Sequence, residues 1–111
     1  EVVNVSFDQL VAGQAGEFDV ALSQVTITDE RREVVDFTEP YFESAQGVLV
    51  MAGTEVATVE DAKALQWGVQ SGTTGAGYVG GELQPEEEAQ VFQDLVAGFA
   101  ALWHTVQLRR S

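Results

Sequence analysis

Arg31 is the side chain of this sequence best suited to bind a carboxylate. Its planar guanidinium can donate two parallel charge-assisted hydrogen bonds to the two carboxylate oxygens, a geometry that lysine cannot copy. The alternative is an ion pair with a nearby Asp or Glu on an acidic surface, a contact worth roughly 0–1 kcal/mol when exposed. Residue type alone favours the surface ion pair. The neighbouring Arg32 is expected to point into solvent.

A second segment that could bind an anion is the stretch Ser-Gly-Thr-Thr-Gly at residues 71–75. It follows a short expected strand at 67–69, and such a flexible turn can present backbone N–H groups to a ligand. The alternative is a turn without a ligand, because glycine-rich turns are common. Two other polar features are weaker candidates for a functional site. His104 has no acidic or serine partner at a recognisable spacing, and residues 86–88 (Glu-Glu-Glu) fit a solvated loop better than a weak cation site.

The composition restricts the classes of protein and partner. The chain has 111 residues, 18 acidic and 5 basic, a net charge of −13 and 45% hydrophobic residues. This is one ordinary domain or two very small ones. The negative charge argues against nucleic acid and against an anionic membrane surface. No cysteine is present, which excludes disulfides, thiolate metal sites and cysteine nucleophiles. No apolar run approaches the roughly 20 residues of a membrane span. The sequence predicts no bound metal and no cofactor.

Strand-like and helix-like segments alternate along the chain, which is typical of βα units around a mainly parallel sheet. The class expected is therefore α/β. Expected strands cover residues 2–5, 18–22 with an extended continuation at 26–28, 47–51, 67–69 and 89–93. Expected helices begin after Ser6, after Thr28 and running to about 35, after Thr58, near Tyr78 and ending at residues 80–81, and after Asp94 with Leu95, Phe99, Leu102 and Val106 on one apolar face.

Two motifs in the right order resemble one known family. Residues 16–31 and 35–41 contain "G-E-F-D", "T-I-T-D-E-R" and "D-F-T-E-P-Y". They closely resemble the extracellular solute-binding proteins, family 3, of polar amino-acid ABC transporters, and ionotropic glutamate receptor cores carry a similar signature. Residues 68–74, "G-V-Q-S-G-T-T", resemble the strand-to-helix loop of the same family. The resemblance extends to about Leu102.

The resemblance implies the type II periplasmic-binding-protein fold, in which two α/β lobes close over a solute by a hinge motion. It assigns residues 1–42 to a partial lobe 1, 43–46 to a hinge and 47–111 to a partial lobe 2. It also implies a ligand carboxylate held by Arg31, with a hydroxyl and an N–H from Thr26. The residues implied at the ligand are Ser23, Thr26 and Arg31 from lobe 1, and Gln70, Thr73 and Thr74 from lobe 2, where the start of a helix favours an anion.

The sequence also departs from the family pattern. It starts at what would be the second strand of lobe 1, and residues 104–107 (His-Thr-Val-Gln) replace the family's "G-x-x-D-A-V-x-x-D", so no acid is assigned to the ligand ammonium. We expect a chain truncated at both ends by gene truncation or frameshift. Sheet edges would then be open, with apolar residues lacking neighbours. The expected remedy is a homodimer, edge-paired or formed by strand exchange.

The sequence is compatible with three functions. The first is a binding module for a polar or acidic amino acid, with an ABC permease as partner only if its docking surface survives. The second is a truncated relic with a structural, oligomeric or unknown role and no ligand. An enzyme is the least supported, because no acid–base pair accompanies Arg31. The resemblance implies a periplasmic or extracytoplasmic location. No signal-peptide pattern is present, so a cytoplasmic location stays open.

Overall fold

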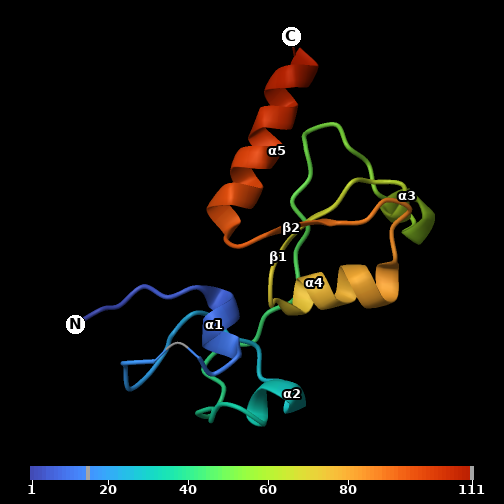
Figure 1. Cartoon of the computed structure of the whole chain (residues 1–111). Helices are drawn as coiled ribbons and strands as arrows, with labels where there is room; N and C mark the ends of the chain where they lie inside the picture. The colour runs from blue at the N-terminus through green and yellow to red at the C-terminus, as the bar shows by residue number, and fades with distance from the viewer. Residues whose placement is uncertain (15, 111) are drawn as a thin grey trace. The chain divides into compact units, whose positions relative to one another are not determined.

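The computed structural model describes residues 1–14 and 16–110, with side chains described as far as residue 103. The described chain forms two compact units, Glu1–Ala45 and Gln46–Ser111, and each is treated by itself (Figure 1). This division, between residues 45 and 46, falls inside the segment 43–46 that is expected to form a hinge. The assignment of 1–42 and 47–111 to two lobes, with 43–46 between them, stays a prediction.

In the first unit, α1 (Phe7–Val11) begins and ends through local contacts. The Ser6 hydroxyl oxygen accepts a hydrogen bond from the backbone N–H of Gln9 at 3.4 Å, as the sequence predicts. Beyond the helix, Gly13 has a φ of +68°, and a Cβ there would lie 3.1 Å from the carbonyl oxygen of Val34. Glycine is required at this position both for the backbone conformation and for the close approach of the chain.

Helix α2 (Asp29–Arg32) is the element that carries Arg31. The Thr28 hydroxyl oxygen accepts a hydrogen bond from the Arg31 N–H at 3.2 Å, which confirms the predicted cap. Asp29 and Glu30 occupy the first turn, where negative charge stabilises the positive end of a helix. The predicted extension to residue 35 is wrong, because the helix ends at Arg32.

The strands predicted in the first unit are not formed. Residues 2–5 and 18–22 are described, and they are irregular rather than paired. Residues 26–28 are predicted only to be extended, and Thr28 has that conformation, with φ −130° and ψ 154°. Val20 and Leu22 are 76% and 80% exposed. A strand needs a neighbour for its N–H and C=O groups and a surface to cover its side chains, and β-propensity alone supplies neither. The apolar run predicts a strand only where both are present.

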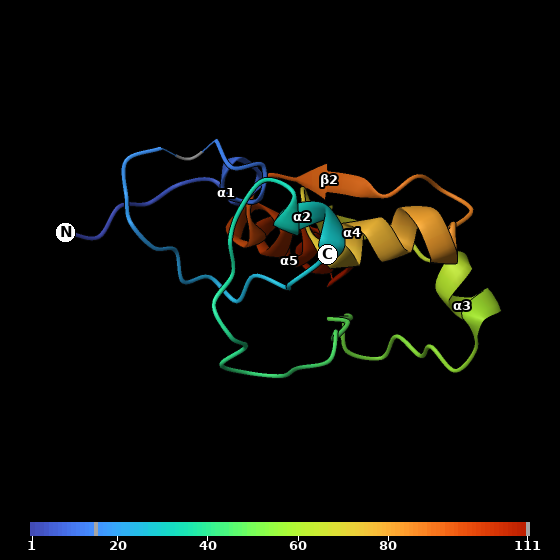
Figure 2. The ribbon, with the colours of Figure 1, turned by 90° about the horizontal axis from the view of Figure 1, so that it is seen from below.

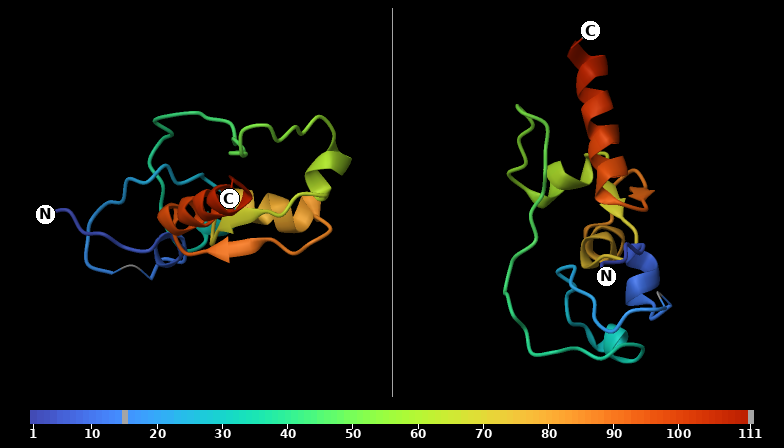
Figure 3. Two further views of the ribbon diagram at one scale, coloured as in Figure 1. Left: turned by 90° about the horizontal axis from the view of Figure 1, so that it is seen from above. Right: turned by 90° about the vertical axis from the view of Figure 1, so that its left-hand side faces the viewer.

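The second unit contains a parallel pair of strands, which gives this part of the chain its α/β character. Within the described residues, β1 (Gly68–Gln70) and β2 (Gln90–Phe92) form a two-stranded sheet in which Val69 lies opposite Val91. Both arrows point the same way in Figure 3. The strands predicted near 67–69 and 89–93 are confirmed. The strand predicted at 47–51 is wrong, since those residues are described without strand structure.

Helix α3 (Val59–Lys63) begins with a reciprocal capping box. The Thr58 hydroxyl oxygen accepts from the Asp61 N–H at 3.1 Å, and the Asp61 carboxylate accepts from the N–H groups of Ala57 and Thr58 at 3.2 and 3.1 Å. These hydrogen bonds favour the ionised carboxylate and lower the pKa of Asp61, with the backbone N–H of Ala57 as the largest cause. The helix predicted after Thr58 is thereby confirmed.

The connection between the strands runs through α4 (Thr74–Tyr78), which continues as the π-helix η1 (Val79–Leu83). Figure 2 shows β2 running beside this helix. The prediction that the helix ends at residues 80–81 is wrong. Val79 and Leu83 are each 5% exposed and are the buried apolar side chains of the described residues. Their burial stabilises the helix past two glycines, although each glycine costs about 1 kcal/mol relative to alanine.

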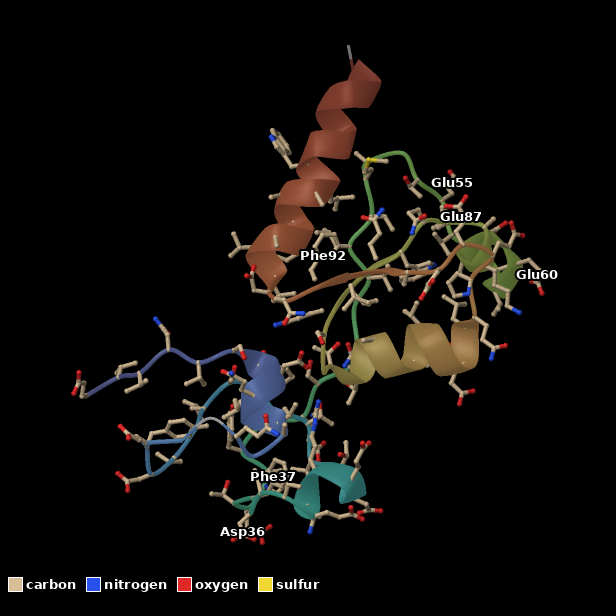
Figure 4. The ribbon with its side chains drawn as sticks, viewed as in Figure 1. Asp36, Phe37, Glu55, Glu60, Glu87 and Phe92 are labelled. Carbon is tan, nitrogen blue, oxygen red and sulfur yellow. The ribbon has the colours of Figure 1, made fainter. Side chains whose placement is uncertain are left out.

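Helix α5 (Leu95–Arg110) packs on the sheet through a glycine contact. A Cβ at Gly68 or at Gly98 would lie 3.1 or 3.6 Å from the ring of Phe92, so this ring packs against both glycines. Figure 4 labels Phe92 beside the start of α5. The Asp94 carboxylate accepts from the Ala97 N–H at 2.8 Å, which confirms the predicted cap.

The apolar face predicted for this helix is only partly buried. Leu95 and Phe99, two members of this face, are 56% and 52% exposed. Gly98, Ala101 and Leu102 are half-buried instead. The side chain of Val106, the last member of the predicted face, lies outside those described. Because residues 95–103 are nearly all apolar, spacing alone did not determine which side faces the sheet.

Candidate functional site

The guanidinium of Arg31 lies inside the first unit, and only 8% of the residue is exposed. Its Nη1 donates a hydrogen bond to the carbonyl oxygen of Thr26 at 2.8 Å. Its Cζ lies 5.6 Å from the centroid of the Phe7 ring, which is within cation–π distance. Burial lowers the pKa of Arg31, and the negative charge of Glu30 opposes that effect. These contacts hold the guanidinium in one orientation between α1 and the chain that precedes α2.

The other two predicted residues in this unit are Thr26, which contacts Arg31, and Ser23, which lies elsewhere. Thr26 contacts Arg31 through its backbone carbonyl, while its side chain is exposed. The exposed Ser23 lines an apolar hollow of about 510 Å³ in the same unit. Neither Thr26 nor Arg31 lines that hollow. The next residue, Gln24, has a φ of 52°, so Ser23 sits before a sharp change of direction instead of at the end of a strand.

In the second unit, Gln70, Thr73 and Thr74 lie together at the carboxyl end of β1, where α/β sheets commonly bind ligands. The Thr73 hydroxyl donates to the carbonyl oxygen of Gln70 at 2.8 Å and accepts from the Ala76 N–H at 3.1 Å. The Thr74 hydroxyl oxygen accepts from Nε2 of Gln46 at 2.9 Å. All three predicted residues are half-buried.

The structure thus groups the predicted residues within each unit. Arg31 and Thr26 meet in Glu1–Ala45, and Gln70, Thr73 and Thr74 meet in Gln46–Ser111. That the two groups share one ligand stays a prediction.

Two residues in these groups were not predicted from the sequence. Phe7 contacts Arg31, and Gln46 contacts Thr74. In the sequence, Phe7 is simply the residue after a helix cap and Gln46 the last residue of a presumed hinge. Phe7 is far from Arg31 along the chain, and Gln46 is far from Thr74, so no local sequence pattern could have identified these contacts.

The described side chains contain no group of three or more His, Asp or Glu residues placed to hold a metal ion. Within the same part of the chain, no helix has both the length and the hydropathy needed to cross a membrane. The described groups offer hydrogen bonding and charge, through Arg31 in one unit and threonine hydroxyls in the other.

Comparison with known proteins identifies relatives over most of the sequence. The chain is 46% identical over 61 residues to a probable histidine-binding protein of Neisseria gonorrhoeae, covering 54% of this chain and 23% of that protein. It is 33% identical over 90 residues to the ABC transporter glutamine-binding protein GlnH of Bacillus subtilis, covering 80% and 33%. It is 33% identical over 106 residues to an L-arginine-binding protein of Pseudomonas aeruginosa, covering 86% and 41%.

The chain therefore spans less than half the length of these relatives. No solved structure gave a significant match. The sequence profile of one protein family matches residues 1–109, which is nearly the whole chain. The chain belongs to the bacterial extracellular solute-binding proteins, family 3.

Proposed function

We propose that the chain binds an amino acid as part of an ABC transporter's solute-binding protein, with Arg31 holding the ligand carboxylate. The observation that carries this proposal is the family match over residues 1–109. The relatives are named for binding histidine, glutamine and arginine, and these ligands share an α-carboxylate and an α-ammonium group. An extracytoplasmic location and an ABC permease as partner belong to the same proposal.

The surroundings of Arg31 support a carboxylate-binding role. Its contacts with Phe7 and with the carbonyl of Thr26 fix the guanidinium before a ligand arrives. Fixing a side chain in advance lowers the entropy lost on binding. The low exposure of the residue also removes water, so that a charge-assisted hydrogen bond is stronger there than on an exposed surface. In this proposal Thr26 and Ser23 complete the first half of the site.

The second half of the proposed site is the loop after β1, with Gln70, Thr73 and Thr74. The hydrogen bonds of Thr73 to Gln70 and Ala76 fix this loop at the start of α4. Residues 43–46 act as the hinge about which the two halves close on the ligand. The closing contacts contribute affinity only when one ligand touches both halves.

A titration with the twenty common amino acids tests this function. We expect heat of binding from at least one of them in isothermal titration calorimetry. The amide of the same amino acid should bind much more weakly, because it lacks the charged carboxylate that Arg31 recognises. No heat from any member of the panel, with the chain shown to be folded by circular dichroism, would contradict the proposal.

One observation favours a structural role without a ligand as the second candidate. Val48, Leu49 and Trp103 are 62%, 65% and 63% exposed, and apolar side chains of this size are stabilised by a partner that covers them. In this role the chain assembles and shows no response to the amino-acid panel.

We propose in addition that the chain forms a homodimer through these apolar residues, by edge pairing or strand exchange. The apolar segment at 47–51 has high β-propensity and is unpaired in the described structure, which favours addition to another strand. Size-exclusion chromatography with light scattering at micromolar concentration should give twice the monomer mass. A compact monomer under these conditions would refute the dimer. The amino-acid titration separates a dimer that binds ligand from one that does not.

A further inference from the structure

The side chain of Gln46 contacts the second half of the proposed site from a distant place in the sequence. Its Nε2 donates to the Thr74 hydroxyl oxygen at 2.9 Å. Its Oε1 lies 3.6 Å from the position a Cβ would take at Gly75. The amide therefore lies along the loop at the start of α4. Gln46 is also the first residue of the second unit, directly after the division of the chain.

The hydrogen bonds of the two threonines differ in one respect that matters for a ligand. A hydroxyl can donate one hydrogen bond and accept two. Thr73 donates to the carbonyl oxygen of Gln70 and accepts from Ala76, so its hydrogen is already used within the chain. Thr74 accepts from Gln46, and nothing in the described part of the chain accepts its hydroxyl hydrogen. Of the two, Thr74 is the one able to donate to a ligand.

The hydrogen bond from Gln46 determines the direction in which the Thr74 hydroxyl can donate its hydrogen. An N–H placed at one lone pair of a hydroxyl turns the O–H hydrogen away from that direction and polarises it, which makes the hydroxyl a better donor. A ligand carboxylate is an acceptor of the kind such a donor favours.

We propose that Gln46 is a positioning residue that directs the Thr74 hydroxyl toward the carboxylate of the bound amino acid. This inference rests on the proposed function. It adds a residue outside the loop itself, and it links the start of the second unit to the state of the binding site. A ligand that bonds to Thr74 strengthens the Gln46 contact, and the contact holds residue 46 in place while the ligand is bound.

Replacing Gln46 by Glu gives the sharpest test. A carboxylate only accepts hydrogen bonds, so Thr74 must turn its hydrogen toward residue 46 and away from the ligand. The added negative charge also repels the ligand carboxylate. We expect Gln46→Glu to weaken binding of the amino acid at least about tenfold, and Gln46→Ala to weaken it about threefold to tenfold, as for loss of one hydrogen bond. Affinities are measured by calorimetry after circular dichroism has shown that each variant is folded.

Gln66 offers a matched control in the same unit. Its Nε2 donates to the carbonyl oxygen of Glu88 at 3.0 Å, so Gln66→Glu makes the same chemical change at another exposed hydrogen bond. We expect the affinity of Gln66→Glu to stay within about twofold of that of the unsubstituted chain, because Gln66 precedes β1 whereas the loop follows it. A Thr74→Ala background is the second control, because there the Gln46→Glu effect should shrink markedly if it acts through the hydroxyl.

The outcomes separate this inference from the proposed function. Loss of affinity in Gln46→Glu that equals the loss in Gln66→Glu overturns the positioning role, as does an effect of the same size in the Thr74→Ala background. Unchanged affinity in Gln46→Glu overturns it as well. If the unsubstituted chain binds no member of the amino-acid panel, the proposed function and this inference both fail.

Discussion

Arg31→Ala should abolish amino-acid binding, with a loss of affinity of at least about a hundredfold. In the proposed site, the substitution removes two charge-assisted hydrogen bonds to the ligand carboxylate, each worth about 1.5–3 kcal/mol. It also removes the charge that compensates the carboxylate inside the protein. Calorimetric titration with the amino acid identified from the panel measures the effect directly. Retention of affinity within about threefold would show that Arg31 serves only the fold, since a clamp lost at this site cannot leave binding intact.

Two further variants separate the clamp from the structural contacts of Arg31. Arg31→Lys keeps the positive charge but not the planar pair of donors, so we expect most of the affinity to be lost. Arg32→Ala removes an equal charge from the adjacent, exposed residue and should leave affinity nearly unchanged. Arg31→Ala also loses its contacts with Phe7 and Thr26, so the titration is run at a temperature where each variant is folded.

Leu83→Ala should strongly destabilise the second unit, by about 2–5 kcal/mol, as large-to-small substitutions in a core do. Leu83 is 5% exposed and, with Val79, forms the buried apolar centre of the described residues. This loss is a large fraction of a domain's whole stability, which is often only about 5–15 kcal/mol.

Leu95→Ala is the matched control for this prediction. Leu95 is 56% exposed, so the same chemical change should alter the free energy of unfolding by less than about 0.5 kcal/mol. Urea denaturation followed by tryptophan fluorescence compares the two variants, because Trp67 lies in the same unit and its indole N–H donates to the carbonyl oxygen of Ala62 at 2.8 Å. Equal destabilisation by the two substitutions would contradict the buried position of Leu83.

The helix starts could be predicted from the sequence because each depends on residues a few positions apart. Ser6, Thr28, Thr58 and Asp94 cap helices through hydrogen bonds to N–H groups three residues on. Such contacts form wherever the local sequence allows them. The helix ends were harder to predict, because burial of Leu83 carried α4 and η1 past two glycines that favour a stop.

The strands were harder to predict than the helix starts, because strand pairing depends on residues that are distant in the sequence. Val69 and Val91 lie on paired strands, whereas residues 18–22 and 47–51 are as apolar but unpaired. What distinguishes them is a partner elsewhere in the chain, and periodicity carries no information about that partner. The same holds for the candidate site. Arg31 could be selected by its motif, but its contact with Phe7 could not.

The capping box of α3 makes the folded state sensitive to acid. The pKa of Asp61 is lowered in the folded chain by its hydrogen bonds, so unfolding raises that pKa and takes up a proton when the solution is acidic. The stabilisation is complete above the pKa that Asp61 has in the unfolded chain and is lost as the pH falls through the lower, folded value. The amide proton shifts of Ala57 and Thr58 should report this titration, with a midpoint below that of an ordinary aspartate.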